Sequence, residues 1–231
     1  MFNGQSQVNE IKRYGDPVWE KISQTQRWGQ YPEIVNFYLG VKNGFENENP
    51  NVKFTPTVLD IGSGGGANAW FMKKEGANLI LFDGQPEFFI QVRDTFQKFF
   101  VPYDGARELL GDITNPIGGK HLNGCIDILI DNYSLVHNAK ENIIRAYEQY
   151  YQLMQPESRS IFYTATFGQK TELKDRGFTA KFTREELNGI FGKIGYKIIR
   201  TIDRQIMENT CGKEKVNTVE LEQLITILGR A

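Results

Sequence analysis

The chain has 231 residues, a formal net charge of −1, an apolar fraction of 40% and an aromatic fraction of 13%. This length suits one sizeable α/β domain, or one domain with a small cap, and the composition is that of a packed globular protein. The balanced charge argues against a chain built mainly to neutralise phosphates, so we expect no nucleic-acid partner.

The first ten residues lack a signal-peptide pattern, and no run approaches the roughly 20 apolar residues that span a bilayer. We therefore expect no membrane partner and a cytoplasmic location. The two cysteines and two histidines, at 125 and 211 and at 121 and 137, do not form a metal-ligand pattern. No metal site is expected.

The first fifty residues differ from the rest and carry two of the three tryptophans, Trp19 and Trp28. They are predicted to form an amino-terminal helical cap over 1–50, in front of a domain over 51–231. Within the cap, a helix beginning near Pro32 is expected to end at Asn43-Gly44. A polar linker over 46–55 should follow it.

From Thr57 onward the pattern is strand, turn, helix, repeated. Strands are expected over 57–61, 78–82, 107–111, 125–130 and 160–166, with helices over 67–75, from 86, before Pro156 and after the capping box of Thr183 and Glu186. Two final strands, 196–202 and 216–228, have no helix between them and predict a hairpin. The expected fold is α/β, a doubly wound, Rossmann-like, seven-stranded sheet whose last strand is antiparallel.

The clearest motif is a glycine-rich turn, Gly62-Ser63-Gly64-Gly65-Gly66, directly after the first strand. Glycines are needed where the backbone bends sharply and approaches a ligand closely. The spacing of Gly62, Gly64 and Ala67 also fits a nicotinamide-binding fold.

Asp60 separates these two possibilities. A dinucleotide places a charged pyrophosphate over such a turn, and a carboxylate two residues before the first glycine would repel it. S-adenosylmethionine instead presents an ammonium group, which Asp60 can attract, and a carboxylate, which the N–H groups of the turn can receive.

Acidic residues also end the second and third strands. Asp83 lies where a carboxylate can accept hydrogen bonds from ribose hydroxyls, and Asp112 where it can accept from an adenine amino group beside the Ile113 N–H. The alternative is that Asp83 and Asp112 cap the helices that follow them.

With these residues the sequence resembles class I S-adenosylmethionine-dependent methyltransferases from about Thr57 to the end, including the closing hairpin. The stretch 28–32 is similar to the entry segment of a subgroup of small-molecule enzymes. The resemblance implies S-adenosylmethionine as cofactor and S-adenosylhomocysteine as product. It implies a cofactor site made of Asp60, Gly62, Ser63, Gly64, Asp83, Gly84, Asp112, Ile113 and Asp131.

The family places acceptor-side groups after the fourth strand, where this chain has Asp131-Asn132-Tyr133 and, six residues beyond Asp131, His137. His137 is the candidate general base, and Asp131 and Tyr133 are candidates for catalysis or for orienting the acceptor. Alternatively, His137 caps or packs against the next helix. The segment lacks the Asn/Asp-Pro-Pro-Tyr of amino-methylating DNA enzymes, so base methylation is disfavoured.

Two further features have open interpretations. Trp19, Trp28 and Tyr31 form either an aromatic lid or ordinary core. The long connection over 167–182, in which Lys170, Lys174, Arg176 and Lys181 outweigh the acids, is either a flap that touches a polar substrate or a solvated loop.

The predicted function is in-line methyl transfer from S-adenosylmethionine to an oxygen or nitrogen of a small-molecule acceptor. An NAD(P)-dependent oxidoreductase is the first alternative, and Asp60 and the hairpin oppose it. A noncatalytic S-adenosylmethionine-binding partner is the second.

Overall fold

The computed structural model describes residues 31–116, 121–156, 160–169, 171, 179–211 and 216–230, with the side chains of 206–221 excepted. It divides into two compact units, one up to Ile113 and one from Thr114. Each unit is described by itself.

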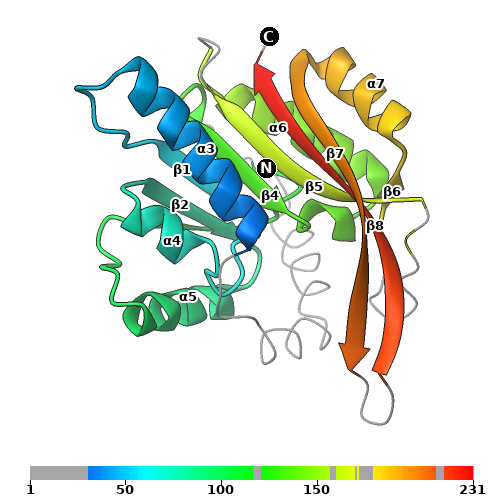
Figure 1. Cartoon of the computed structure of the whole chain (residues 1–231), viewed down its shortest axis with the longest axis horizontal. Helices are drawn as coiled ribbons and strands as arrows, with labels where there is room; N and C mark the ends of the chain where they lie inside the picture. Colours follow the sequence, from blue (N-terminus) through cyan, green and yellow to red (C-terminus); the bar gives the residue numbers. More distant parts are fainter. Residues whose placement is uncertain are drawn as a thin grey trace, which may run out of the picture. The chain divides into compact units, whose positions relative to one another are not determined.

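The first unit contains parallel strands in the order β3-β2-β1. They are β1 (Thr57–Ile61), β2 (Asn78–Asp83) and β3 (Arg107–Leu110), and the helices are α3 (Pro32–Glu48), α4 (Ala69–Lys74) and α5 (Pro86–Lys98) (Figure 1). Consecutive helices touch through aromatic rings, Tyr38 with Phe71 at 6.1 Å and Trp70 with Phe99 at 4.0 Å. Because β1, β2 and β3 are parallel, the turns that follow them lie at one edge of the sheet.

The expected end of the first helix is wrong. α3 does not stop at Asn43-Gly44 but continues to Glu48. The added turn is held by tertiary contact, since the ring of Phe45 lies 5.1 Å from that of Phe54. Asn49 then closes the helix, because its backbone N–H and its side-chain amide both donate to the Phe45 carbonyl, at 2.9 and 3.0 Å. The linker predicted over 46–55 is correspondingly shorter.

The second unit contains strands in the order β4-β5-β8-β7, and β6 pairs with β5. They are β4 (Ile128–Asn132), β5 (Ile161–Gly168), β6 (Lys181–Phe182), β7 (Tyr196–Cys211) and β8 (Val216–Arg230). The helical segments are η2 (Leu135–His137), α6 (Lys140–Leu153) and α7 (Arg184–Ile194). β8 is antiparallel to both β5 and β7, so the predicted antiparallel last strand is confirmed.

Two strand predictions in this unit need correction. β4 begins at Ile128 and not at Cys125, because Ile126 makes only an isolated bridge with Met154. The closing hairpin is longer than expected, with 16 residues in β7 and 15 in β8. Pairing of β8 with β5 ends at Gln223, and Figure 1 shows the rest of the hairpin projecting as a ribbon beyond it.

Helices α6 and α7 pack on the strands of this unit through an aromatic core. The ring of Tyr147 lies 5.9 Å from that of Phe162 and 5.0 Å from that of Phe191. The predicted capping box of α7 is confirmed, since Thr183 Oγ1 accepts from the Glu186 N–H at 3.0 Å and the Thr183 N–H donates to Glu186 at 2.8 Å.

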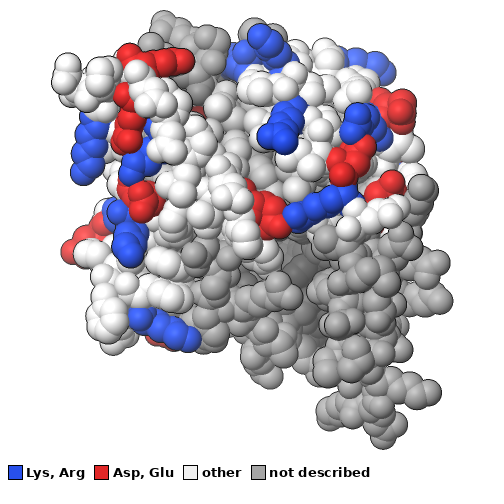
Figure 2. Space-filling view, viewed as in Figure 1, with Lys and Arg blue, Asp and Glu red and all other residues white. Residues whose placement is uncertain are grey.

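The described surface mixes charges of both signs. Figure 2 shows basic and acidic side chains interspersed on the face in view. Lys42 pairs with Glu75 at 2.8 Å and Arg93 with Glu108 at 2.7 Å. No helix in the described residues has the length and apolar character needed to cross a membrane.

Candidate cofactor site

The turn between β1 and α4 depends on glycine. Gly62, Gly64 and Gly66 have φ angles of 65°, 50° and 77°, a left-handed conformation that other L residues rarely adopt. The N–H groups of Gly62 and Ser63 donate to the Phe82 carbonyl at 2.7 and 3.2 Å. The turn after β1 is thereby fastened to the end of β2.

Asp83, the last residue of β2, strengthens this link. Its Oδ2 accepts a hydrogen bond from the Gly64 N–H at 2.9 Å, and its Oδ1 accepts one from the Gln85 N–H at 3.0 Å. The side chain is only 6% exposed. Burial raises the pKa of Asp83 to about 6, while hydrogen bonds from the N–H groups of Gly64, Gln85 and Gly84 act in the opposite direction.

The turn after β3 joins the same edge. The Gly111 N–H donates to the Asp83 carbonyl at 3.0 Å. A Cβ added at Gly84 would lie 3.5 Å from the Gly111 carbonyl oxygen, so the two turns are in close contact. Asp112 and Ile113 follow at once, both half-buried. Three strand ends thus meet, and each contributes residues predicted to bind the cofactor.

Two buried polar side chains belong to this edge. Asp60 is 4% exposed and lies within β1, opposite Leu81 of β2. Ser63 is 8% exposed, and within the described part of the chain its Oγ has no hydrogen-bond partner. Buried polar atoms normally have a partner, so an unpartnered hydroxyl in a ligand-free structure indicates where a ligand atom can bind.

The edge suits S-adenosylmethionine chemically. Carboxylates at Asp60, Asp83 and Asp112 are acceptors for ammonium, hydroxyl and amino groups. The turn supplies the Ser63 hydroxyl as a donor, because the N–H groups of Gly62, Ser63, Gly64 and Gly66 already donate to acceptors within the protein. These residues all belong to the first unit.

Asp131 in the second unit is surrounded by hydrogen-bond donors of the protein. It is fully buried within β4. Its Oδ1 accepts from the N–H groups of Ser134 and Leu135 at 2.9 and 3.1 Å, and its Oδ2 accepts from Thr164 Oγ1 at 2.9 Å. Burial raises the pKa of Asp131 to about 6. This geometry holds the start of η2, and the catalytic and cofactor roles predicted for Asp131 stay predictions.

Tyr133 follows β4 and has a strained backbone. Its φ of 67° is uncommon for a bulky residue, and such strain is found preferentially at functional sites. The ring stacks on Phe167 of β5, with centroids 4.9 Å apart and planes inclined by 22°. This contact was not predicted from the sequence. Phe167 is far from Tyr133 along the chain, so no local sequence pattern connects the two residues.

His137 is the last residue of η2 and is half-buried. The preceding carbonyl, that of Val136, accepts from the Ala180 N–H at 2.7 Å, which fixes η2 to the segment before β6. The catalytic roles of His137 and Tyr133 stay predictions.

Several other predictions involve residues outside those described. The aromatic lid and the basic flap stay predictions, because they involve Trp19, Trp28, Lys170, Lys174 and Arg176. The cap over 1–50 stays a prediction as well. Within the described part of 167–182, the expected loop contains the short strand β6, and Thr171 Oγ1 donates to the Glu222 carbonyl at 2.9 Å. No group of three or more His, Cys, Asp or Glu residues able to hold a metal ion occurs in the described ranges.

Comparison with known proteins places the fold. No protein-family profile and no curated protein matches the sequence. Among solved structures, a S-adenosylmethionine-dependent methyltransferase from Methanosarcina mazei aligns with a TM-score of 0.59 at 14% identity, over 87% of this chain and 98% of that one.

Two further neighbours were crystallised with the cofactor or its product. The magnesium protoporphyrin IX methyltransferase of Synechocystis, with bound S-adenosylmethionine, aligns with a TM-score of 0.58 at 16% identity, over 94% of this chain and 91% of that one. The 1,6-didemethyltoxoflavin-N1-methyltransferase of Burkholderia thailandensis, with bound S-adenosylhomocysteine, aligns with a TM-score of 0.57 at 14% identity, over 84% of this chain and 78% of that one.

The chain has the fold of S-adenosylmethionine-dependent methyltransferases. The Rossmann-like architecture with an antiparallel last strand, inferred from the sequence, is therefore confirmed. The expected count of seven strands is one too low for the described residues, because the loop predicted over 167–182 contributes the short strand β6, which pairs with β5. In this methyltransferase fold, the glycine turn follows β1, Asp83 is the last residue of β2, and Asp112 follows β3.

Proposed function

We propose that this protein is an enzyme that transfers the methyl group of S-adenosylmethionine to an oxygen or nitrogen of a small molecule. The observation that carries the proposal is the edge where the turns after β1, β2 and β3 are tied together by hydrogen bonds from Gly62, Ser63, Gly64 and Gly111. Because a buried serine hydroxyl at that edge has no described partner, the edge is suited to receive a polar ligand.

Each residue has a defined task in this proposal. Asp60 attracts the ammonium group of the cofactor, and the Ser63 hydroxyl donates to its carboxylate. Asp83 and Gly84 bind the ribose, while Asp112 and the Ile113 N–H bind the adenine.

S-adenosylmethionine supplies an electrophilic methyl group, so the chain has to align the acceptor atom with the methyl–sulfur bond. His137 is the candidate base that takes the acceptor's proton, an effect worth about 10²–10⁴-fold where it operates. Tyr133 is the candidate for orienting the acceptor. S-adenosylhomocysteine is then released.

The proposed cofactor is tested by thermal unfolding with S-adenosylmethionine, S-adenosylhomocysteine, NAD and NADP. A ligand that binds only the folded state raises the free energy of unfolding by mass action, by about 2.7 kcal/mol at a hundredfold excess over Kd, and the midpoint temperature rises with it. We expect a shift with the first two ligands only. A shift with NAD or NADP alone would favour the oxidoreductase alternative and reject the proposal.

The contribution of Ser63 is tested by Ser63→Ala. Because the Oγ has no described partner, its loss should leave folding stability near wild type, whereas S-adenosylhomocysteine should bind several-fold more weakly, consistent with about 1 kcal/mol for one hydrogen bond. Calorimetric titration measures this.

The matched control is Thr226→Val, which removes another buried hydroxyl without a described partner, in the second unit. It should leave the affinity unchanged. Equal affinity in wild type and Ser63→Ala would exclude Ser63 from the site.

A further inference from the structure

The first unit has a pocket at the edge opposite the glycine turn. It encloses about 310 Å³ and is lined by Lys73, Lys74, Phe99, Phe100, Val101 and Pro102. α4 and α5 each begin at the carboxyl edge of the strands and run back across the sheet, so the residues at their ends lie at the amino edge. The pocket is therefore distinct from the candidate cofactor site.

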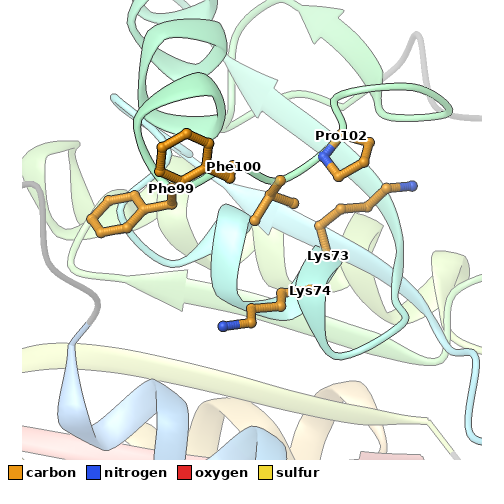
Figure 3. Close-up of a pocket in the computed structure, with 6 residues that line it drawn as sticks. Lys73, Lys74, Phe99, Phe100 and Pro102 are labelled. Atoms are coloured by element: carbon orange, nitrogen blue, oxygen red, sulfur yellow. The ribbon is translucent and has the colours of Figure 1, made fainter.

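One wall of the pocket is aromatic. Figure 3 shows the rings of Phe99 and Phe100 on one side in this view, with Lys73 and Pro102 on the other. The Phe99 ring is held in place by stacking on Trp70, with centroids 4.0 Å apart and planes inclined by only 9°. A fixed aromatic wall can stack on a planar ligand with little loss of side-chain entropy.

Phe100 occupies its position at a cost. Its N–H donates to the Gln97 carbonyl at 3.1 Å and the Val101 N–H donates to the Phe96 carbonyl at 2.9 Å, the two bonds of a Schellman motif at the end of α5. The left-handed residue of this motif is usually glycine, but here it is Phe100, with φ of 54°. The side chain is also 94% exposed. A strained and exposed phenylalanine indicates a surface that binds something.

Lys73 and Lys74 favour a ligand with a negative charge. Within the described residues neither Lys73 nor Lys74 takes part in an ion pair, and the adjacent acid, Glu75, is paired with Lys42 at 2.8 Å. Their place in the last turn of α4 is favourable for cations, which explains two lysines but not the aromatic wall beside them. Two uncompensated ammonium groups beside a fixed aromatic ring match an anion on a planar aromatic body.

We propose that this pocket binds a small aromatic anion, with Phe99 and Phe100 against its ring and the positive charge of Lys73 and Lys74, which approach from different sides, attracting its negative group. A volume of about 310 Å³ lies at the lower end of the range for small-molecule sites and suits a ligand of one or two fused rings. The proposal is independent of the function assigned to the opposite edge.

The test uses the full chain with 2-naphthoate as the anionic probe and 2-naphthalenemethanol as its neutral counterpart. We expect the anion to bind about fivefold or more tightly than the alcohol, because charge-assisted contacts to ammonium groups are the stronger ones. The indole N–H resonance of Trp70 should shift as the probe binds, since its ring lies directly behind Phe99.

The double variant Lys73→Gln with Lys74→Gln should lose the preference for the anion, and Phe100→Ser should weaken the binding of both probes. The matched control, Lys193→Gln with Lys197→Gln, removes the same charge, and Lys193 lies likewise in the last turn of a helix. It should bind as wild type does. Equal affinity for the two probes, or a preference that survives the Lys73/Lys74 substitutions, would overturn the proposal, whatever the affinity for S-adenosylhomocysteine.

Discussion

Phe100 and Tyr133 are the two non-glycine residues with positive φ in the described part of the chain, and their surroundings differ. Tyr133 is stacked on Phe167, so contacts within the fold stabilise its conformation. Phe100 projects into solvent, and no ring contact with a described residue offsets its backbone strain. A substitution that relieves the backbone strain at Phe100 should therefore raise the free energy of unfolding.

We predict that Phe100→Gly raises the free energy of unfolding by about 0.5–1 kcal/mol. Relief of left-handed strain contributes about 1–2 kcal/mol, and the greater freedom of glycine in the unfolded chain offsets part of it. Urea unfolding measures the change.

A suitable control is Ile90→Gln, which removes an apolar side chain that is 58% exposed on α5, where the backbone is helical. It should change stability by less than about 0.5 kcal/mol. A destabilised Phe100→Gly variant would show that the left-handed backbone at Phe100 costs less than the freedom that glycine adds to the unfolded chain.

The acids at strand ends have similar sequence contexts but different environments. Asp83 accepts hydrogen bonds from the turns at its own edge, which is compatible with a ligand site. Asp131 is buried in the core and accepts a hydrogen bond from Thr164, which lies 33 residues further along the chain. Local sequence does not encode that contact. Residue type and spacing alone therefore could not predict these two different environments.

At the scale of elements, type and order followed from hydrophobic periodicity and from turn residues, but several ends did not. The Asn43-Gly44 pair is a typical helix stop, yet α3 passes through it because Phe45 packs on Phe54. The hairpin is extended by pairing between β7 and β8 alone, which gives strands longer than their apolar alternation indicated. In both cases tertiary or cross-strand contacts outweigh local propensity.

At the scale of the whole molecule, the fold class and the glycine-turn edge could be predicted because both follow from strands that alternate with helices and end in specific residues. The pocket beside Phe100 could not, since Lys73 and Lys74 come together with Phe99 and Phe100 only when α4 packs against α5. Its sequence signs, two adjacent lysines and two adjacent phenylalanines, are common in surface and core segments alike.

Two buried acids should make the stability of the whole chain depend on pH. Asp83 in the first unit and Asp131 in the second both have folded-state pKa values of about 6, above the ordinary value of 3.8. Between these values the folded protein binds more protons than the unfolded chain. Stability from these groups is therefore greatest below about pH 4, falls as pH rises to about 6, and is constant above that, because the slope follows the difference in bound protons.

We predict that Asp131→Asn removes the share due to Asp131. The amide oxygen can still accept from the N–H groups of Ser134 and Leu135, and the amide nitrogen can donate to Thr164, whose hydroxyl also contacts Tyr147 at 3.1 Å. Relative to wild type, the variant should gain about 1–3 kcal/mol between pH 4 and pH 7. Urea unfolding at intervals of one pH unit measures this gain, and Asp94→Asn, at an exposed acid of α5, should show none. A wild-type-minus-variant difference that stays constant with pH would show that Asp131 ionises alike in the folded and unfolded states.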